Sequence, residues 1–324
     1  MLTALLACVA LCAQEPAPAS QPATRPAAFA FAWPVGSRGR VKEAQSKDGV
    51  DLAMSSELVL SARAPSAPAA GADAAGELLL ERGDPRIESY RGYSASHPFV
   101  QKLILKLDEA SPVQPALVLG PDGALRGLAN YDAILDDLVQ RQAAAGLTKE
   151  EQRVARERLS SEAERARAER QMREQWDAWV AHWIGVPLEA GWTETRELSF
   201  ELPSGKRART GSVERRVRGL EERAGASCWH LSRFEQRSGP WFFKHVGGQL
   251  PQWMPGLELS KVRACTLFDQ VDAWIDVQTL RPLEVTRRHA LRVELAADDP
   301  AAPSTVQKSE NTSTWTFEWS APAK

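Results

Sequence analysis

The sequence lacks the short motifs that mark the common catalytic and cofactor-binding sites. It contains no GxSxG nucleophile elbow, no glycine-rich phosphate loop and no HExxH zinc motif. The histidines are isolated from one another, and none has the spacing of a metal-ligand pair: His97, His182, His230, His245 and His289. We therefore predict a non-enzyme with no catalytic residues, no metal site and no cofactor. An enzyme whose site is assembled from distant residues is the remote alternative, because geometry and not order defines such a site.

An excess of charge of either sign is also missing. The 324 residues include 40 lysines and arginines against 42 aspartates and glutamates, so the formal net charge is -2. A nucleic-acid-binding protein normally shows a basic excess or a basic stripe. We therefore expect no nucleic-acid partner. With 43% hydrophobic residues, the chain has enough apolar side chains for one large core or two ordinary ones.

Long apolar runs are absent beyond the first residues. Leu2 to Ala13 is uncharged and apolar, but it is shorter than the about 20 residues that a membrane-spanning helix needs. The run suits a secretory signal, so we predict a signal peptide over residues 1–13 and export to the periplasm, the cell surface or the medium. Lipid attachment at Cys8 or Cys12 is the less favoured alternative, because the apolar run before Cys8 is very short and Leu11 precedes Cys12. We expect no transmembrane helix in the mature chain.

Cysteine is scarce, with four residues in the chain. Cys8 and Cys12 belong to the predicted signal, which leaves Cys228 and Cys265. Both lie in strand-like segments, and an exported protein reaches an oxidising compartment. We therefore predict a disulfide between Cys228 and Cys265; two buried free thiols are the alternative.

What the sequence does contain is an ordered series of strand and helix patterns. Residues 14–28 are rich in proline and alanine and are predicted to be a disordered linker. Residues 29–129 are predicted to form an N-terminal β lobe. Its clearest hairpin has strands at 41–45 and 50–62 on either side of Lys47-Asp48-Gly49. A further strand is expected at 99–107, where leucines alternate with other residues.

Residues 130–185 are predicted to be helical. Asn130 is a suitable N-cap for a first helix, and Thr148 to Glu151 form a capping box that opens a second helix reaching about Ile184. Arginine and glutamate alternate over 148–175, which is typical of a solvated helix. Its last turns carry an apolar stripe that we expect to dock on a sheet: Trp176, Trp179 and Trp183.

Residues 186–320 are predicted to form a C-terminal β lobe. Strand patterns recur at 197–202, 211–222, 227–236, 261–268, 272–277, 282–295 and 312–319. Trp315, Phe317 and Trp319 alternate strictly, so one face of the last strand should meet a core. The predicted fold class is α+β, mostly antiparallel β in two lobes with a helical segment between them.

The segment 239–259 is unusually aromatic for a stretch broken by glycine and proline. It supplies the ligand-binding candidates Trp241, Phe242, Phe243, Trp253 and Met254. One interpretation is an apolar lip that admits a lipid-like ligand or contacts a membrane or a partner. The alternative is a long connection that plugs one end of a β core.

Two hairpin sequences resemble those of known exported proteins. They are LVLGPDGALRGL at 117–128 and Trp274-Ile275-Asp276 with Thr279-Leu280-Arg281-Pro282. They are similar to exported bacterial families of unknown function that are related to the outer-membrane lipoprotein carrier (LolA-like). The resemblance implies a strongly curved antiparallel sheet, or half-barrel, that wraps over helices and holds an acyl chain. The charged helix at 148–175 departs from the carrier pattern.

Together these patterns predict an exported, non-enzymatic envelope protein that binds an apolar or lipid-like ligand in a curved β-sheet. The alternative is a structural or protein-interaction module that contacts an envelope protein through the charged helix at 148–175. The sequence leaves open the ligand, the oligomeric state and whether the two β lobes form one sheet or two domains.

Overall fold

A computed structural model describes most of the chain beyond residue 26. The described residues are 27–63, 76–102, 104, 113–144, 146, 148–201, 205–223, 225–250, 254, 256–297 and 303–320. The predicted signal peptide at 1–13 and nearly all of the linker at 14–28 lie outside them.

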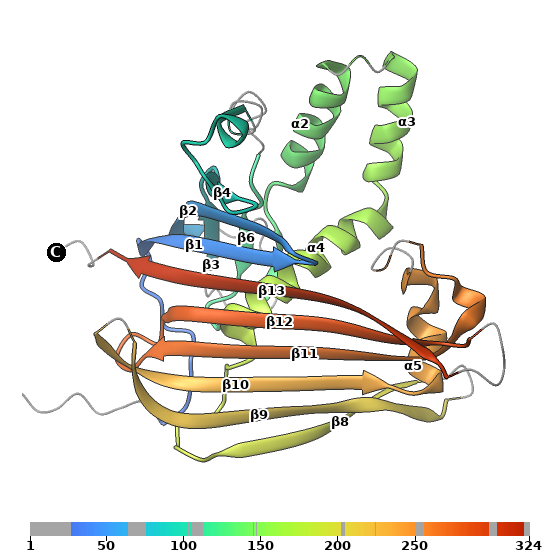
Figure 1. The fold of residues 1–324 in the computed structure, drawn as a ribbon. Coiled ribbons are helices and arrows are strands. Elements are labelled where there is room, and N and C mark those ends of the chain that lie inside the picture. Colours follow the sequence, from blue (N-terminus) through green and yellow to red (C-terminus); the bar gives the residue numbers. More distant parts are fainter. Residues whose placement is uncertain are drawn as a thin grey trace, which may run out of the picture.

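The described residues form one antiparallel sheet of 13 strands (Figure 1). In chain order the strands are β1 (Arg38–Lys47), β2 (Val50–Arg63), β3 (Glu77–Arg82), β4 (Arg86–Tyr90), β5 (Tyr93–Ser94), β6 (Leu117–Leu119), β7 (Leu125–Leu128), β8 (Thr193–Glu201), β9 (Arg207–Arg223), β10 (Ala226–Ser238), β11 (Val262–Asp276), β12 (Pro282–Leu295) and β13 (Thr305–Trp319). Their main order in space is β7-β6-β3-β2-β1-β13-β12-β11-β10-β9-β8, with β4 paired to β2 and β5 paired to β4. The sheet is therefore open, with β7 and β8 at its edges.

The pairing of β1 with β13 joins the strands that the sequence analysis had assigned to two lobes. These strands run antiparallel from Gly39 opposite Trp319 to Lys47 opposite Asn311. Val41 and Phe317 are paired in this register, and both are buried. The inward apolar residues of β13 therefore lie beside those of β1, and the two predicted lobes share one sheet.

The helical segment contains three α-helices and a π-helical turn. They are α2 (Tyr131–Ala144), α3 (Lys149–Leu159), α4 (Glu162–Trp176) and the π-turn η1 (Asp177–Ala181). The predicted capping box is confirmed, since Thr148 and Glu151 bond reciprocally at the start of α3. The prediction of a single helix from 148 to 184 was wrong, because Ser161 caps a new helix by accepting a hydrogen bond from the Glu164 amide.

The main core lies between one face of the sheet, here called the inner face, and α4 with η1. The predicted tryptophan stripe is confirmed as the docking face: Trp176, Trp179 and Trp183 are all buried. Trp176 also donates its indole N–H to the carbonyl of Gly123 at 2.9 Å. By contrast, none of the described α3 residues is buried, and α2 and α3 project away from the sheet (Figure 1).

A second, smaller core lies at one end of the same face. Helix α5 (Pro240–Val246), the 3-10 turns η2 (Gly247–Gln249) and η3 (Leu259–Lys261) and the residues near them cover the ends of β11 and β12. Its buried members are Phe242, Val246, Leu250, Met254, Leu257, Cys265, Leu291, Val293 and Leu295. The inner face is thus covered by α4 and η1 over one part and by α5 over the other.

The predicted disulfide between Cys228 and Cys265 was wrong, because both cysteines are buried free thiols. They lie on neighbouring strands but near opposite ends of the pair: Cys228 is opposite Asp276, whereas Thr266 is opposite Ser238. Ten strand residues span about 33 Å, and a disulfide requires Cα atoms within about 7 Å. Adjacent strands therefore do not bring these two cysteines together.

The strand expected at 99–107 was also wrong where the structure describes it. Residues 98–102 and 104 are helical, and the others lie outside the described part of the chain. Pro98 stands at the first helical position, which proline favours because its missing N–H is not needed there. Here the helix-start signal outweighed the alternation of leucines.

Candidate functional site

The inner face carries charged side chains in the middle of several adjacent strands. On β11, Val271 and Ala273 point into the main core and Cys265 into the second core. Because side chains alternate along a strand, Asp269 points to this same face, between the two cores. Asp269 lies opposite His289 of β12 and Glu235 of β10, whereas Arg287 and Arg233 lie opposite Val271, the next inward residue of β11.

We call this set the polar belt. Its members are Glu43 on β1, Arg82 on β3, Arg233, Glu235 and Arg237 on β10, Asp269 on β11, Arg287 and His289 on β12, and Asn311 and Ser313 on β13. Several of them are almost fully enclosed, among them Glu43, Glu235 and Asp269, which are about 5 to 6% exposed. Along β11 and β12 the belt lies between the residues of the two apolar cores.

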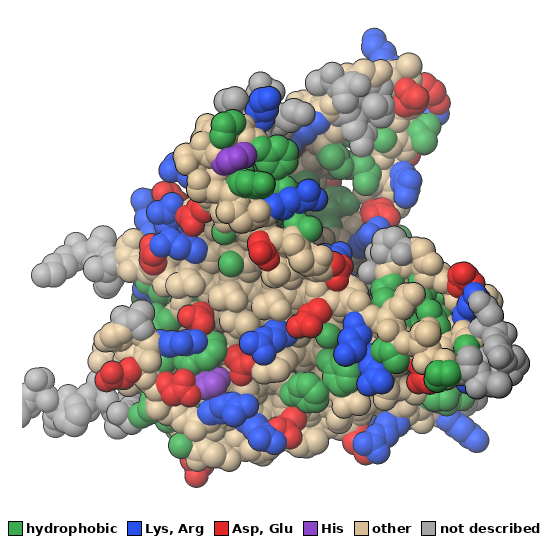
Figure 2. Space-filling view, in the orientation of Figure 1, with side chains coloured by type: hydrophobic (Ala, Val, Ile, Leu, Met, Phe, Trp, Pro, Cys, Tyr) green, Lys and Arg blue, Asp and Glu red, His purple; other side chains and the backbone are tan. Residues whose placement is uncertain are grey.

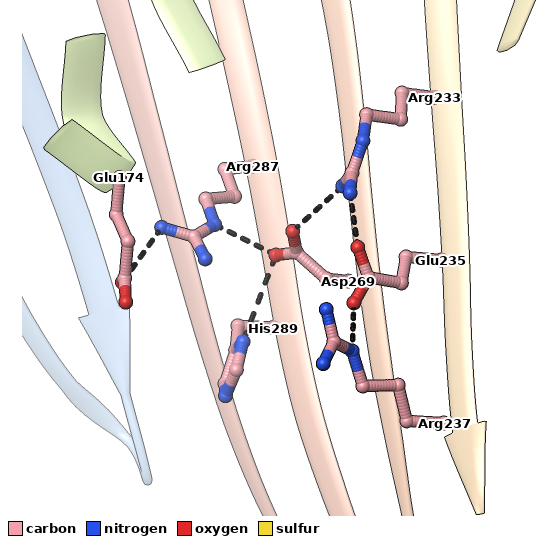
Figure 3. A network of polar contacts seen from close by, with 7 residues as sticks. All are labelled: Glu174, Arg233, Glu235, Arg237, Asp269, Arg287 and His289. Carbon is pink, nitrogen blue, oxygen red and sulfur yellow. Dashed lines mark hydrogen bonds and ion pairs between the residues drawn. The ribbon is translucent and has the colours of Figure 1, made fainter. Parts of the chain in front are cut away.

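Ion pairs connect the belt from strand to strand (Figure 3). The Asp269 carboxylate accepts hydrogen bonds from Arg287 at 2.7 Å and from Arg233 at 3.2 Å. Glu235 is paired with both Arg233 and Arg237. Glu174 of α4 reaches Arg287 at 3.5 Å, so the helix above the sheet is tied to the same network.

The network keeps its central groups charged. Burial alone would raise the pKa of Asp269, but His289 and Arg287 hold it well below its usual range. Burial alone would likewise lower the pKa of Arg287, yet Asp269 and Glu174 raise it. His289 adds an imidazole whose Nδ1 atom lies 3.6 Å from Asp269, which is too long for a hydrogen bond.

The π-turn η1 borders the belt with two further titratable groups. Its wider turn is closed by the amide of His182, which donates to the carbonyl of Asp177 at 3.0 Å. Burial raises the pKa of Asp177, although Arg173 and Arg233 oppose this. Burial and the nearby Arg233 lower the pKa of His182 to about 3, so this imidazole is neutral near pH 7. Such π-turns occur frequently at functional sites.

Two cavities lie over the polar belt. One, of about 410 Å³, lies between η1 and α5 and is bordered by Asp177, His182 and Phe242. The other, of about 390 Å³, lies on the opposite side of Glu174 and is bordered by Glu43, Arg82 and Trp315. Both are lined by Glu174, Arg287 and His289, so the two cavities adjoin at these residues, and we call them together the groove. Their volumes are within the range of small-molecule sites, about 300–1,000 Å³.

A small apolar cavity opens beside this groove. It measures about 120 Å³ and shares Arg82, Met172 and Gln175 with the 390 Å³ cavity. Its apolar walls come from five elements: Leu58 of β2, Leu80 of β3, Leu117 of β6, Met172 of α4 and Trp179 of η1. We call it the anchor pocket.

Four buried polar atoms along these cavities have no hydrogen-bond partner among the described residues. They are the indole Nε1 atoms of Trp179 and Trp315, the Nδ1 atom of His289 and the Oδ1 atom of Asn311. Trp179 borders the anchor pocket, and the other three border the 390 Å³ cavity. Buried polar groups in proteins are nearly always satisfied, so these four atoms are exceptions that a bound ligand or water would remove.

The residues proposed from sequence as ligand contacts lie mostly in the second core. Phe242 and Met254 are buried there, and Phe243 packs against them. Trp241 is 41% exposed, with the Lys244 ammonium 5.6 Å from its ring centroid. Trp253 lies outside the described residues. Of the four that are described, only Phe242 borders the groove.

The sequence analysis missed the polar belt. Its signal is the presence of charged residues at inward positions of strands whose other inward residues are apolar, as for Asp269 between Leu267 and Val271. The pattern identifies a site only when the strand register is known, because the register places Asp269 opposite His289 and His289 opposite Asn311. Single strands with one inward charge are otherwise unremarkable.

The outer face of the sheet also carries charged side chains of both signs (Figure 2). Figure 2 views this face, with α4 behind the strands, and shows acidic and basic side chains interspersed over it. Within the described residues, no group of three or more His, Cys, Asp or Glu side chains is placed to hold a metal ion. Among the described helices, none is long and apolar enough to cross a membrane.

Comparisons with known proteins give no family for this chain. No protein-family model matches it, and no curated protein matches its sequence.

Proposed function

We propose that this protein is a non-catalytic binding protein that holds a polar ligand in the groove over the polar belt. The supporting observation is the position of the belt. Buried charges are costly even when paired, and apolar residues at the same places would join the two cores. The chain instead keeps Asp269, Glu235 and Arg233 there, beneath cavities of ligand size.

The electrostatics of the belt favour binding over acid–base chemistry. His289 and Asp269 share a cavity, which is the arrangement that a dispersed catalytic site would need. A general base works best when its pKa lies near the operating pH. The pKa of Asp269 is held far below that range, and the pKa of His182 is about 3. Fixed, paired charges are better suited to orienting a ligand than to exchanging protons with it.

The proposed ligand site is testable with the full mature chain. We would record the thermal unfolding of the purified protein against amino acids, short peptides, sugars, carboxylates and phosphates. A compound at about 100 times its Kd adds about 2.7 kcal/mol to stability, which raises Tm by several degrees. The shift should disappear in Arg287→Lys, which keeps the charge but loses the planar fork.

The matched control is Arg292→Lys, on the same strand but on the outer, exposed face. It should keep the full shift. A compound that stabilises the wild type and Arg287→Lys equally would place its site elsewhere and contradict the proposal.

The cellular place and the finer fold class also belong to the proposal. We propose an exported envelope protein with a half-barrel similar to the outer-membrane lipoprotein carrier (LolA-like). The apolar run at 1–13 supports export, and the open antiparallel sheet with helices on one face supports the fold class. Cell fractionation of the chain with and without residues 1–13 tests the location, since only the longer chain should leave the cytoplasm.

An apolar or lipid-like ligand is a second candidate, favoured by the anchor pocket with its leucine and methionine walls. Native mass spectrometry with lipid extraction tests it. An acyl-type adduct that survives Trp241→Ala but is lost when the anchor pocket is filled would favour this candidate and place the ligand at the pocket rather than at segment 239–259.

The interaction-module alternative is favoured by α3. Its described residues are all at least partly exposed, and Val154 is 51% exposed beside a cavity of about 530 Å³ between α3 and α4. Crosslinking in the native cell from position 154 tests this alternative. A specific envelope-protein adduct would support it, whereas an absence of adducts would count against it.

A further inference from the structure

The anchor pocket is too small to enclose the whole of a long acyl chain. At about 120 Å³ it is smaller than an engineered apolar cavity of about 150 Å³ that binds benzene in another protein. It therefore accommodates a branched group of the size of a leucine or valine side chain. The leucine walls are rigid β-strand positions, with Leu58 and Leu80 almost fully buried.

The unpartnered atoms around the anchor pocket and the adjoining 390 Å³ cavity match the polar atoms of a peptide unit. The indole N–H groups of Trp179 and Trp315 are donors, and the rings of both residues are more than nine-tenths buried. The Oδ1 atom of Asn311 is an acceptor. A peptide supplies both a carbonyl and an N–H at short, regular spacing, whereas an anionic head group supplies acceptors alone.

The charges lining the groove are balanced. Around the 410 Å³ cavity, the four arginines Arg170, Arg233, Arg237 and Arg287 face the four acidic residues Glu174, Asp177, Glu235 and Asp269. Around the 390 Å³ cavity, two arginines face two glutamates. An even mixture complements a ligand with charges of both signs, and it gives no preference to a phosphate or a carboxylate alone.

The length of the groove sets the length of the occupant. Its lining extends from Arg82 on β3 to Arg233 on β10, and these strands are separated by β2, β1, β13, β12 and β11. Six strand spacings amount to about 29 Å, which an extended chain covers with about eight residues.

We infer that the groove binds an extended peptide segment of another protein, with one aliphatic side chain in the anchor pocket and flanking residues of both charge signs over the polar belt. The inference rests on the proposed function and names its ligand class. The aliphatic side chain fixes the register, the tryptophan N–H groups bind the adjoining carbonyl groups, and the belt pairs with the charged residues on one side of the anchor.

The test is selection from a displayed library of random peptides of about eight residues against the full mature chain. Selected sequences should share one aliphatic residue at a fixed position, followed or preceded by both acidic and basic residues. Leu80→Phe fills the anchor pocket, and Trp315→Phe removes one N–H while keeping a ring. Each should weaken binding of the selected peptides by about tenfold.

Two matched variants control for general damage to the fold. Leu79→Phe places the same substitution on the adjacent residue, on the outer face of β3. Trp229→Phe removes another buried, unpartnered indole N–H, on β10 and outside the three cavities. Both variants should bind the selected peptides about as tightly as the wild type.

The outcomes separate this inference from the proposed function. A library that yields no binders, or binders with no fixed aliphatic position, overturns the inference. So does displacement of the peptides by lauroyl lysophosphatidylcholine in the wild type but not in Leu80→Phe, which assigns the pocket to an acyl chain. If peptides depend on Arg287 but not on Leu80, the polar site stands and the anchor fails. If they depend on neither, both proposals fail.

Discussion

Arg287 on β12 donates a hydrogen bond of 2.7 Å from its Nε atom to the Oδ1 atom of Asp269 on β11. The two residues are diagonal neighbours, because the register places His289 opposite Asp269 and Val271 opposite Arg287. Diagonal side chains on one face lie within reach of a long arginine. The same carboxylate also accepts from Arg233 of β10, so one buried charge joins three adjacent strands.

Replacing Asp269 by Asn should destabilise the protein strongly. The substitution leaves Arg233 and Arg287 without their shared buried carboxylate, and breaking a buried pair from one side costs about 3–5 kcal/mol. The matched control is Glu318→Gln, whose ion pair with Lys42 is exposed and worth about 1 kcal/mol or less. Urea unfolding monitored by tryptophan fluorescence measures both; equal losses would contradict the role given to the belt.

The free energy of unfolding should fall as the pH is lowered from about 6.5. The pKa of His182 is about 3 in the folded protein and about 6.5 when unfolded, so the unfolded chain binds more protons between these values. The expected slope is up to about 1.4 kcal/mol per pH unit. His182→Gln should reduce this slope between about pH 4.5 and 6, a pH range above the one in which Asp269 titrates. An unchanged slope would rule out His182 as the source.

The free energy of unfolding should also fall as the pH rises above about 6.5, and here the cause is a different histidine, His230. Burial alone would lower the pKa of His230, but hydrogen bonds to Asp272 and Glu221 raise it above its usual value. Its contribution is full below the unfolded pKa of about 6.5 and is lost as the pH passes the folded value. In His230→Gln the decline above about pH 6.5 should disappear. Unfolding curves across this range measure it, and a decline that persists would contradict the assignment.

Replacing a buried tryptophan by alanine should cost much more stability than replacing an exposed one. Trp176 is fully buried and donates to Gly123, so Trp176→Ala should cost about 3–5 kcal/mol. Trp241 is 41% exposed, so Trp241→Ala should cost about 1 kcal/mol or less. Chemical denaturation compares the two. A comparable loss at Trp241 would mean that the second core depends on this ring.

Cys228 and Cys265 should stay reduced even after purification from an oxidising compartment. Burial raises the pKa of the Cys228 thiol and raises that of Cys265 to about 11, so neither forms a reactive thiolate near pH 7. An aromatic disulfide reagent should titrate both thiols in denaturant and react slowly with the native protein. An intact mass two hydrogens lower without reduction would contradict the strand register.

Local elements were predictable because their causes are local. The capping box at Thr148 and Glu151 and the Lys47-Asp48-Gly49 turn each depend on residues within one turn of the chain. The tryptophan stripe was predictable because helical spacing places Trp176, Trp179 and Trp183 on one side. The break before α4 also had a local signal, since Ser161 precedes Glu164 by three residues.

The amino-acid sequence by itself determined the strand and helix patterns and which strand faces are apolar, because these follow from residue spacing along one element. The tertiary structure alone decided that β1 pairs with β13, that Cys228 and Cys265 lie far apart, and that Asp269, Arg287 and His289 meet. These relationships depend on the register between strands distant in the chain. A shift of one residue would turn every belt residue of a strand to the opposite face, and only the packing of both cores against the helices fixes that register.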